Sequence, residues 1–149
     1  MQSFKDAEGL DWTIQLDTRL VRDIRSELGV DLLRLDEKSM TLLVEDDEKL
    51  VDVISFICTG QIEKRELDAV SFAKAVIGGA IDDACDALVA ELVFISRRSR
   101  GVIVAKAWEK VTEAQDKMTA KAMEVLESGV IEQKIDDALK KMSEQLGMP

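Results

Sequence analysis

The chain has 149 residues and a formal net charge of −10 at pH 7, with 46% hydrophobic and 34% charged residues. This length suits one folded domain, the apolar share is too high for a disordered chain, and the acidity argues against a nucleic-acid partner, since phosphate binding needs clustered Lys and Arg. No apolar run reaches the ~20 residues of a membrane span, and the first residues lack a signal-peptide layout. We therefore expect a cytoplasmic protein that binds no membrane.

The residue types limit the chemistry that this chain can perform. It has no histidine and no tyrosine, and histidine is the commonest general base and metal ligand in proteins. Cys58 and Cys85 lie among apolar residues, which indicates buried thiols in a reducing compartment. Cys85 has no histidine that could activate it as a nucleophile. The commonest catalytic tools are therefore absent, which does not by itself exclude catalysis, and we expect no cofactor and no metal.

The stretch FKDAEGLDWTIQL, residues 4–16, predicts a β-hairpin. Residues 6–9 supply the turn, and Gly9 suits a positive φ. After Gly9 the strict alternation predicts one apolar face, formed by Leu10, Trp12, Ile14 and Leu16. A lone two-stranded hairpin is marginally stable, so this face needs a cover. We expect the first helix to provide it, with a partner strand added at the hairpin edge as the alternative.

The remainder of the chain predicts a mainly α fold. Apolar spacing indicates about five to six helices, over residues 18–28, 48–60, 69–77, 81–95, 102–126 and 130–146. The expected N-caps are Thr18, Asp46 or Asp47, and Asp68, and Gly29 is the expected C′ residue. Residues 39–44 carry weak signals, and residues 61–67 read as a polar connection. The predicted architecture is thus an N-terminal hairpin packed on a helical bundle, followed by a long C-terminal helical segment.

The chain is expected to have two parts, a hairpin and helical domain over residues 1–100 and a C-terminal helical arm over residues 101–149. The long helix carries a narrow stripe of small or soft side chains, namely Ile103, Ala107, Val111, Ala114, Met118, Ala122 and Val125. We favour packing of this stripe on the first part as core. The alternative is a partner-binding arm, because methionine-rich amphipathic faces adapt to varied helical ligands.

Candidate partner-binding residues follow from the second alternative. They are Trp108, Val111, Met118, Met123, Ile135 and Met142, whereas Trp12 is expected to belong to the core. On the last helix, one side is expected to carry Ile131, Ile135, Leu139, Met142 and Leu146. Charging the stripe with Val111→Glu and Met118→Glu should then abolish partner binding and leave residues 1–100 folded.

Two charged clusters have a structural explanation and a functional one. Asp82 and Asp86 belong to a DDxxD pattern, which binds magnesium and diphosphate in prenyl-transferring enzymes, but this chain is short for such an enzyme and has no second cluster. We expect an exposed acidic stripe there. Arg97, Arg98 and Arg100 form the one basic cluster, which we interpret as a solvated junction between helices rather than an anion site.

The order of parts resembles a known family. The hairpin SFKDAEGLDWTIQL leads into TRLVRDIRSELGVDLL, and then come VDVISFICTG, SFAKAVIGGAIDDACDALVAEL and a charged helical C-terminus. This layout, over most of residues 3–100, is similar to the tail assembly chaperones, or tail-assembly-associated proteins, of long-tailed bacteriophages and prophages. The likeness lies in the pattern, because the family is divergent and has no catalytic signature to match.

The resemblance implies a non-enzymatic role in the bacterial host cytoplasm. Family members bind the long helical tape measure protein and keep it soluble, and they recruit tail tube subunits. Many are made in two forms through a translational frameshift, and Lys140-Lys141 is compatible with a slippery run of adenines. The alternative function is a self-associating helical structural or adaptor protein, in which the C-terminal helices form a homo-oligomer.

Overall fold

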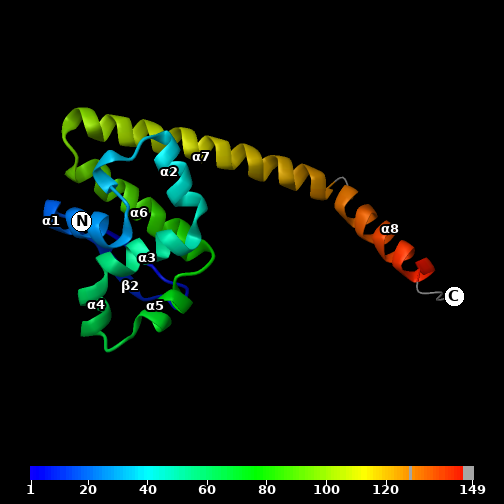
Figure 1. Ribbon diagram of the computed structural model, residues 1–149, viewed down its shortest axis with the longest axis horizontal. Coiled ribbons are helices and arrows are strands. Elements are labelled where there is room, and N and C mark those ends of the chain that lie inside the picture. Colours follow the sequence, from blue (N-terminus) through cyan, green and yellow to red (C-terminus); the bar gives the residue numbers. More distant parts are fainter. Residues whose placement is uncertain (128, 146–149) are drawn as a thin grey trace. The chain divides into compact units, whose positions relative to one another are not determined.

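The computed structural model describes residues 1–127 and 129–145. These residues contain two β-strands and eight α-helices (Figure 1). In chain order the elements are β1 (Gln2–Lys5), β2 (Asp11–Ile14), α1 (Thr18–Leu28), the 3-10 turn η1 (Leu32–Arg34), α2 (Glu37–Glu45), α3 (Asp47–Ile57), α4 (Thr59–Lys64), α5 (Ala69–Ala75), α6 (Gly79–Ile95), α7 (Arg98–Glu127) and α8 (Val130–Gln145). The predicted mainly α fold with an N-terminal β-hairpin is confirmed.

Aspartate side chains cap α1, α2, α3 and α5. The carboxylates of Asp46 and Asp68 accept backbone N–H bonds from Lys49 and Ser71 and so cap α3 and α5, as predicted. The cap of α1 is Asp17, whose carboxylate accepts the N–H of Leu20 at 2.8 Å. The prediction of Thr18 was therefore wrong by one residue. Gly29 ends α1 in the left-handed conformation, with φ 71°.

Two helices lie where the sequence signals were weak. The helix α2 covers the stretch without a clear pattern, where it buries only Met40 and Leu43. The helix α4 occupies part of the predicted polar connection, and it buries only Ile62. Short helices with one or two buried residues leave little apolar periodicity to detect.

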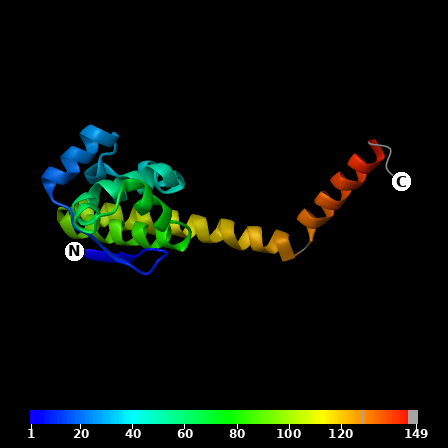
Figure 2. The ribbon, with the colours of Figure 1, turned by 90° about the horizontal axis from the view of Figure 1, so that it is seen from below.

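The chain divides into two compact units, Met1–Val111 and Thr112–Pro149, called unit 1 and unit 2 here. In unit 1 the hairpin is antiparallel, with Phe4 opposite Trp12, and it packs mainly on α6. The expectation that α1 covers the hairpin was wrong, since Figure 2 shows the hairpin and α1 on opposite sides of unit 1. The predicted apolar face holds at Trp12, Ile14 and Leu16, whereas Leu10 precedes β2 and is exposed.

The core of unit 1 centres on α6, whose Ala84, Leu88 and Leu92 are buried. The first part of α7 packs into the same core through Val104, Ala107 and Val111. Packing of the long helix as core thus extends as far as Val111, and the predicted boundary at residue 100 falls inside unit 1. The predicted stripe is out of register at its start, because Val104 is fully buried and Ile103 is 52% exposed.

A glycine permits the close approach of α6 and α7. A Cβ atom at Gly101 would lie 3.2 Å from the carbonyl oxygen of Val93, which is tighter than ordinary van der Waals contact. Gly101 is buried on α7. Any larger side chain at this position would push the two helices apart.

Unit 2 contains the rest of α7 and all of α8. Gly129 precedes α8 with φ 73°, a conformation that glycine adopts at little cost. The predicted interruption also included Ser128, and the predicted inward side of α8 included Ile131 and Leu146. Ser128, Leu146 and the side chain of Ile131 lie outside the described residues.

Candidate protein-binding surfaces

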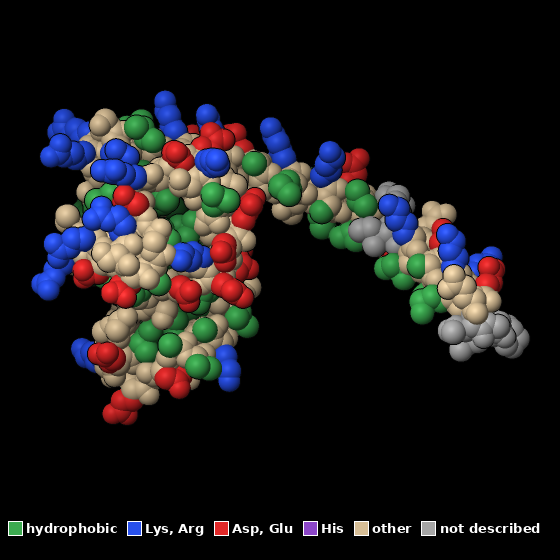
Figure 3. Space-filling model, in the orientation of Figure 1, with side chains coloured by type: hydrophobic (Ala, Val, Ile, Leu, Met, Phe, Trp, Pro, Cys, Tyr) green, Lys and Arg blue, Asp and Glu red, His purple; other side chains and the backbone are tan. Residues whose placement is uncertain are grey.

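Exposed apolar side chains follow one another along both helices of unit 2. We call this set the apolar stripe, and it consists of Met118, Ala122, Val125 and Leu126 on α7 and Ile135, Leu139 and Met142 on α8. Figure 3 shows the hydrophobic side chains of unit 2 along its lower edge, while Lys side chains project from the upper edge. Both helices are therefore amphipathic, with the apolar side open to solvent.

The α7 part of the apolar stripe forms a shallow groove of about 410 Å³. Its lining is Met118, Lys121, Ala122, Val125 and Leu126. The spacing of three and four residues places these side chains on one side of the helix. Their chemistry suits apolar contact with another helix, with the Lys121 ammonium at the margin.

The predicted partner-binding residues separate into two groups. Met118, Ile135 and Met142 are exposed by 69%, 54% and 56% and belong to the apolar stripe. Met123 is also exposed, but it does not line the α7 groove. Trp108 and Val111 belong to unit 1.

Within unit 1, Trp108 is half-buried against the core, and Val111 is a core residue at 5% exposure. Neither side chain is presented at the surface as Met118 is. Leu139 was predicted on the same side of the last helix as Ile135 and Met142 but was not named as a partner-binding residue. The residue missed from the sequence is Leu126, which repeats four residues after Ala122, so helical spacing alone could have found it.

A buried polar cluster organises the hairpin. Asp6 is 6% exposed, and its Oδ1 accepts the backbone N–H groups of Glu8 and Leu10 at 2.9 and 3.0 Å. The indole Nε1 of Trp12 donates to Asp6 Oδ2 at 2.9 Å. Burial on its own would raise the pKa of Asp6, but these three hydrogen bonds, with the charge of Arg65, outweigh it and lower the pKa.

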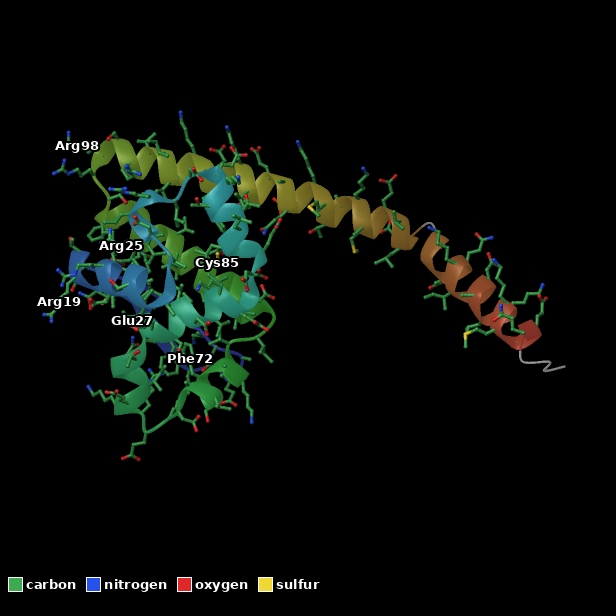
Figure 4. The ribbon with its side chains drawn as sticks, in the orientation of Figure 1. Arg19, Arg25, Glu27, Phe72, Cys85 and Arg98 are labelled. Atoms are coloured by element: carbon green, nitrogen blue, oxygen red, sulfur yellow. The ribbon has the colours of Figure 1, made fainter. Side chains whose placement is uncertain are left out.

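Two aromatic contacts hold Trp12 in the core, as expected. Phe72 on α5 meets it edge to face, with ring centroids 4.8 Å apart. The guanidinium of Arg65, which follows α4, lies 4.3 Å from the Trp12 ring centroid. Figure 4 labels Phe72 in the interior of unit 1. The hairpin is thereby joined to α4 and α5 as well as to α6.

The cysteines are buried, and the acidic pattern is exposed. Cys58 and Cys85 are buried and free, and burial raises the pKa of each thiol to about 12. Asp82 and Asp86 are exposed on α6. Within residues 1–127 and 129–145, no group of three or more carboxylate or thiol side chains is arranged to hold a metal ion.

The basic cluster lies at the junction of α6 and α7, as predicted. Arg97, Arg98 and Arg100 are all exposed, and Figure 4 shows Arg98 projecting outward at the start of α7. The cluster is therefore a solvated corner of unit 1.

No helix in the described part of the chain combines the length and apolar character needed to cross a membrane.

The chain was compared with known proteins, and no protein-family model, no curated protein and no solved structure matches it.

Proposed function

We propose that this protein is a non-enzymatic tail assembly chaperone of a long-tailed bacteriophage or prophage, acting in the bacterial host cytoplasm. Its apolar stripe binds a helical protein of the tape-measure type, and the complex recruits tail tube subunits. The observation that supports this proposal is the exposed row of large apolar side chains along unit 2, from Met118 to Met142. The proposed family is supported by the layout of residues 3–100 in the sequence.

The energetics favour a macromolecular ligand for the stripe. Each large apolar side chain that moves from water into an interface contributes about 1.5–3 kcal/mol. Contiguous exposed apolar surface of this kind usually marks an interaction site. Met118 and Met142 are flexible and polarisable, so they fit partner helices of varied sequence. The net charge of −10 would keep such a complex dispersed.

The direct test is co-expression of the full chain with the tape-measure-type protein from the same genome. The variant Met118→Glu/Ile135→Glu should lose co-purification, because it places two charges in the apolar stripe. The control is Ala120→Glu, which adds one negative charge to α7 outside the apolar stripe and is matched to the single variant Met118→Glu, measured beside the double variant. Ala120 is exposed and lies on the side opposite Met118, since two residues turn a helix by about 200°. Equal co-purification of the double variant and the control would refute the proposal.

The same stripe also supports the alternative of self-association. Two copies could cover each other's apolar side chains and leave no need for a tape-measure-type partner. Sedimentation equilibrium of the full chain over a range of concentrations separates the two functions. A stable oligomer that Met118→Glu/Ile135→Glu dissolves, together with no binding to the tape-measure-type protein, would favour the structural or adaptor role.

A further inference from the structure

The outer edge of β1 carries backbone groups that no other element satisfies in the described residues. Thr13 donates its N–H to Gln61 Oε1 at 2.9 Å and accepts from Gln61 Nε2 at 2.8 Å, so its backbone groups point away from β1. Thr13 pairs with Ser3. In an antiparallel ladder such a pair is the non-hydrogen-bonded one. The N–H and C=O of Ser3 therefore point outward, and those of Lys5, two residues on, do the same.

The outer edge of β2, by contrast, is covered by side chains. Gln61 pairs with Thr13 on the outside of β2, and Arg65 donates to the carbonyl oxygen of Asp11. Beyond β1, the N–H of Ala7 donates to the carbonyl oxygen of Ala75 at 2.8 Å. The open edge is thus confined to β1 itself. Natural proteins usually cover or block such an edge, because it is a template for another strand.

A groove of about 600 Å³ runs along this open edge. One wall is β1, with Ser3 and Lys5, and the other wall is α6. The α6 side includes Ala87 and Ala90, whose small side chains leave room beside the strand. A further strand would lie about 4.8 Å from β1, within this space.

The charges around the groove set the chemistry of what it can take. Asp11, Asp83 and Asp86 line it, and Lys5 is the one cation among the residues that line it. Asp86 is exposed, but the partial burial of its carboxylate raises its pKa, and the neighbouring carboxylates of Asp83 and Asp82 raise it further. A positively charged side chain placed in the groove would relieve this repulsion.

We propose that the groove between β1 and α6 binds an extended, basic segment of a partner protein as an added strand beside β1. The backbone of the segment pairs with Ser3 and Lys5, and its Lys or Arg side chains at alternate positions face Asp83 and Asp86. This site lies in unit 1 and does not depend on the apolar stripe. It therefore stands or falls separately from the chaperone function.

The test uses the full chain and a short fluorescein-labelled peptide of alternating threonine and lysine with blocked ends. Two control peptides are a glutamate-for-lysine version and a version N-methylated on the residues whose N–H groups would face β1. Fluorescence anisotropy at low salt should show saturable binding of the lysine peptide and no such binding of either control peptide. N-methylation keeps the charge and removes the backbone donors, so it separates strand addition from general attraction to an acidic protein.

Two pairs of variants locate the site. Ser3→Pro removes the outward N–H and keeps the hairpin bonds, since proline is tolerated at an edge position whose N–H faces solvent. Ser3→Ala retains that N–H and is the matched control. We expect Ser3→Pro to weaken the lysine peptide about fivefold or more through the lost hydrogen bond and its geometry, and Ser3→Ala to leave binding unchanged. Asp83→Asn/Asp86→Asn should weaken binding similarly, whereas Asp136→Asn/Asp137→Asn on α8 should not.

Circular dichroism and thermal unfolding confirm that each variant is folded. Binding that survives both Ser3→Pro and N-methylation would show attraction by charge alone and overturn the proposal. No saturable binding of the lysine peptide to the folded full chain would overturn it as well. If Ser3→Pro fails to fold, the comparison of the N-methylated and unmodified lysine peptides on the wild-type chain decides the same question.

Discussion

The Trp12 indole and the Asp6 carboxylate form a buried hydrogen bond of 2.9 Å that closes the β-hairpin from inside. The same carboxylate accepts two backbone N–H groups of the turn, while the N–H of Asp6 donates to the carbonyl oxygen of Leu10 at 2.9 Å. One side chain thus determines both the shape of the turn and the position of the central aromatic residue. The hairpin in turn presents β1 to the groove beside α6.

The first prediction concerns the acceptors of Asp6. Asp6→Asn keeps the shape of the side chain but replaces one acceptor oxygen with a donor, so at least one of the three N–H groups loses its partner. We expect the free energy of unfolding at pH 7 to fall by about 1–3 kcal/mol, measured by urea titration. Asp11→Asn is the matched control on the same hairpin, since Asp11 is exposed. An equal loss in both variants would show that the buried hydrogen bonds are not responsible.

The second prediction is a pH dependence with a definite sign. The folded pKa values of Asp6, Asp36 and Asp68 all lie below the ordinary value. For Asp36 and Asp68 the cause is foremost a backbone N–H bond, from Ser39 and Ser71. Their stabilising contribution is therefore complete above the unfolded pKa of about 3.9 and is lost as the pH falls through the folded pKa.

The variant Asp6→Asn isolates one part of this acid dependence. Urea titrations at several pH values between neutrality and the acid limb should show wild type losing more stability than Asp6→Asn. The difference between the two should shrink as the pH falls, because protonated Asp6 no longer accepts three hydrogen bonds as a charged group. A difference that stays constant with pH would contradict the lowered pKa of Asp6.

The third prediction concerns the two thiols. With a pKa of about 12, about one Cys58 or Cys85 side chain in ten thousand is ionised at pH 8. We expect iodoacetamide to modify neither thiol in the folded chain over a period that fully modifies the introduced thiol of an Ala120→Cys variant. Both should react in urea. Rapid modification of both thiols in the folded wild type would show that solvent reaches them and that unit 1 is more open than its structure indicates.

The fourth prediction tests the close approach of α6 and α7. Gly101→Val places new atoms against the Val93 carbonyl oxygen and should lower the free energy of unfolding by about 1–3 kcal/mol. The matched control is Gly60→Val on α4, because a Cβ at Gly60 would meet nothing within 4 Å. That variant should change stability by about 0.5 kcal/mol or less, through helix propensity alone. Equal effects at the two glycines would contradict the α6–α7 contact.

Local signals predicted the elements well, and long-range packing was harder to predict. The hairpin, the caps at Asp46 and Asp68 and the glycine at the end of α1 each depend on neighbours within a few residues. The cover of the hairpin depends on α6, which lies far along the chain, and every amphipathic helix offers a similar apolar side. Proximity in sequence therefore favoured α1, and the structure brings α6 there instead.

The same distinction applies to the candidate surfaces. Helical spacing identified Met118, Ile135 and Met142, and these are exposed on unit 2. Spacing could not show that the core ends at Val111, because the stripe continues beyond it with the same period. It also could not show that Gln61 and Arg65 close the outside of β2 and leave β1 open. That asymmetry arises from one side chain on α4 and one just after it, both in the stretch predicted as a polar connection.

The fifth prediction locates the end of the core on α7. Val111 and Met118 are both stripe residues in the sequence, but Val111 is 5% exposed and Met118 is 69% exposed. Val111→Glu should lower the free energy of unfolding of unit 1 by about 3–5 kcal/mol, because it buries a carboxylate without a partner. Met118→Glu should change it by about 0.5 kcal/mol or less. The two variants carry the same added charge seven residues apart, so each serves as the other's control.

Urea unfolding followed by tryptophan fluorescence measures this contrast, since Trp12 and Trp108 both lie in unit 1. The double variant Val111→Glu/Met118→Glu should unfold unit 1, in contrast to the expectation from the sequence that residues 1–100 would remain intact. A stable Val111→Glu variant would show that the core ends before Val111 and would return this residue to the candidate binding surface. A strongly destabilised Met118→Glu variant would show that the stripe is covered within the folded chain, and partner binding through it would then require that cover to open.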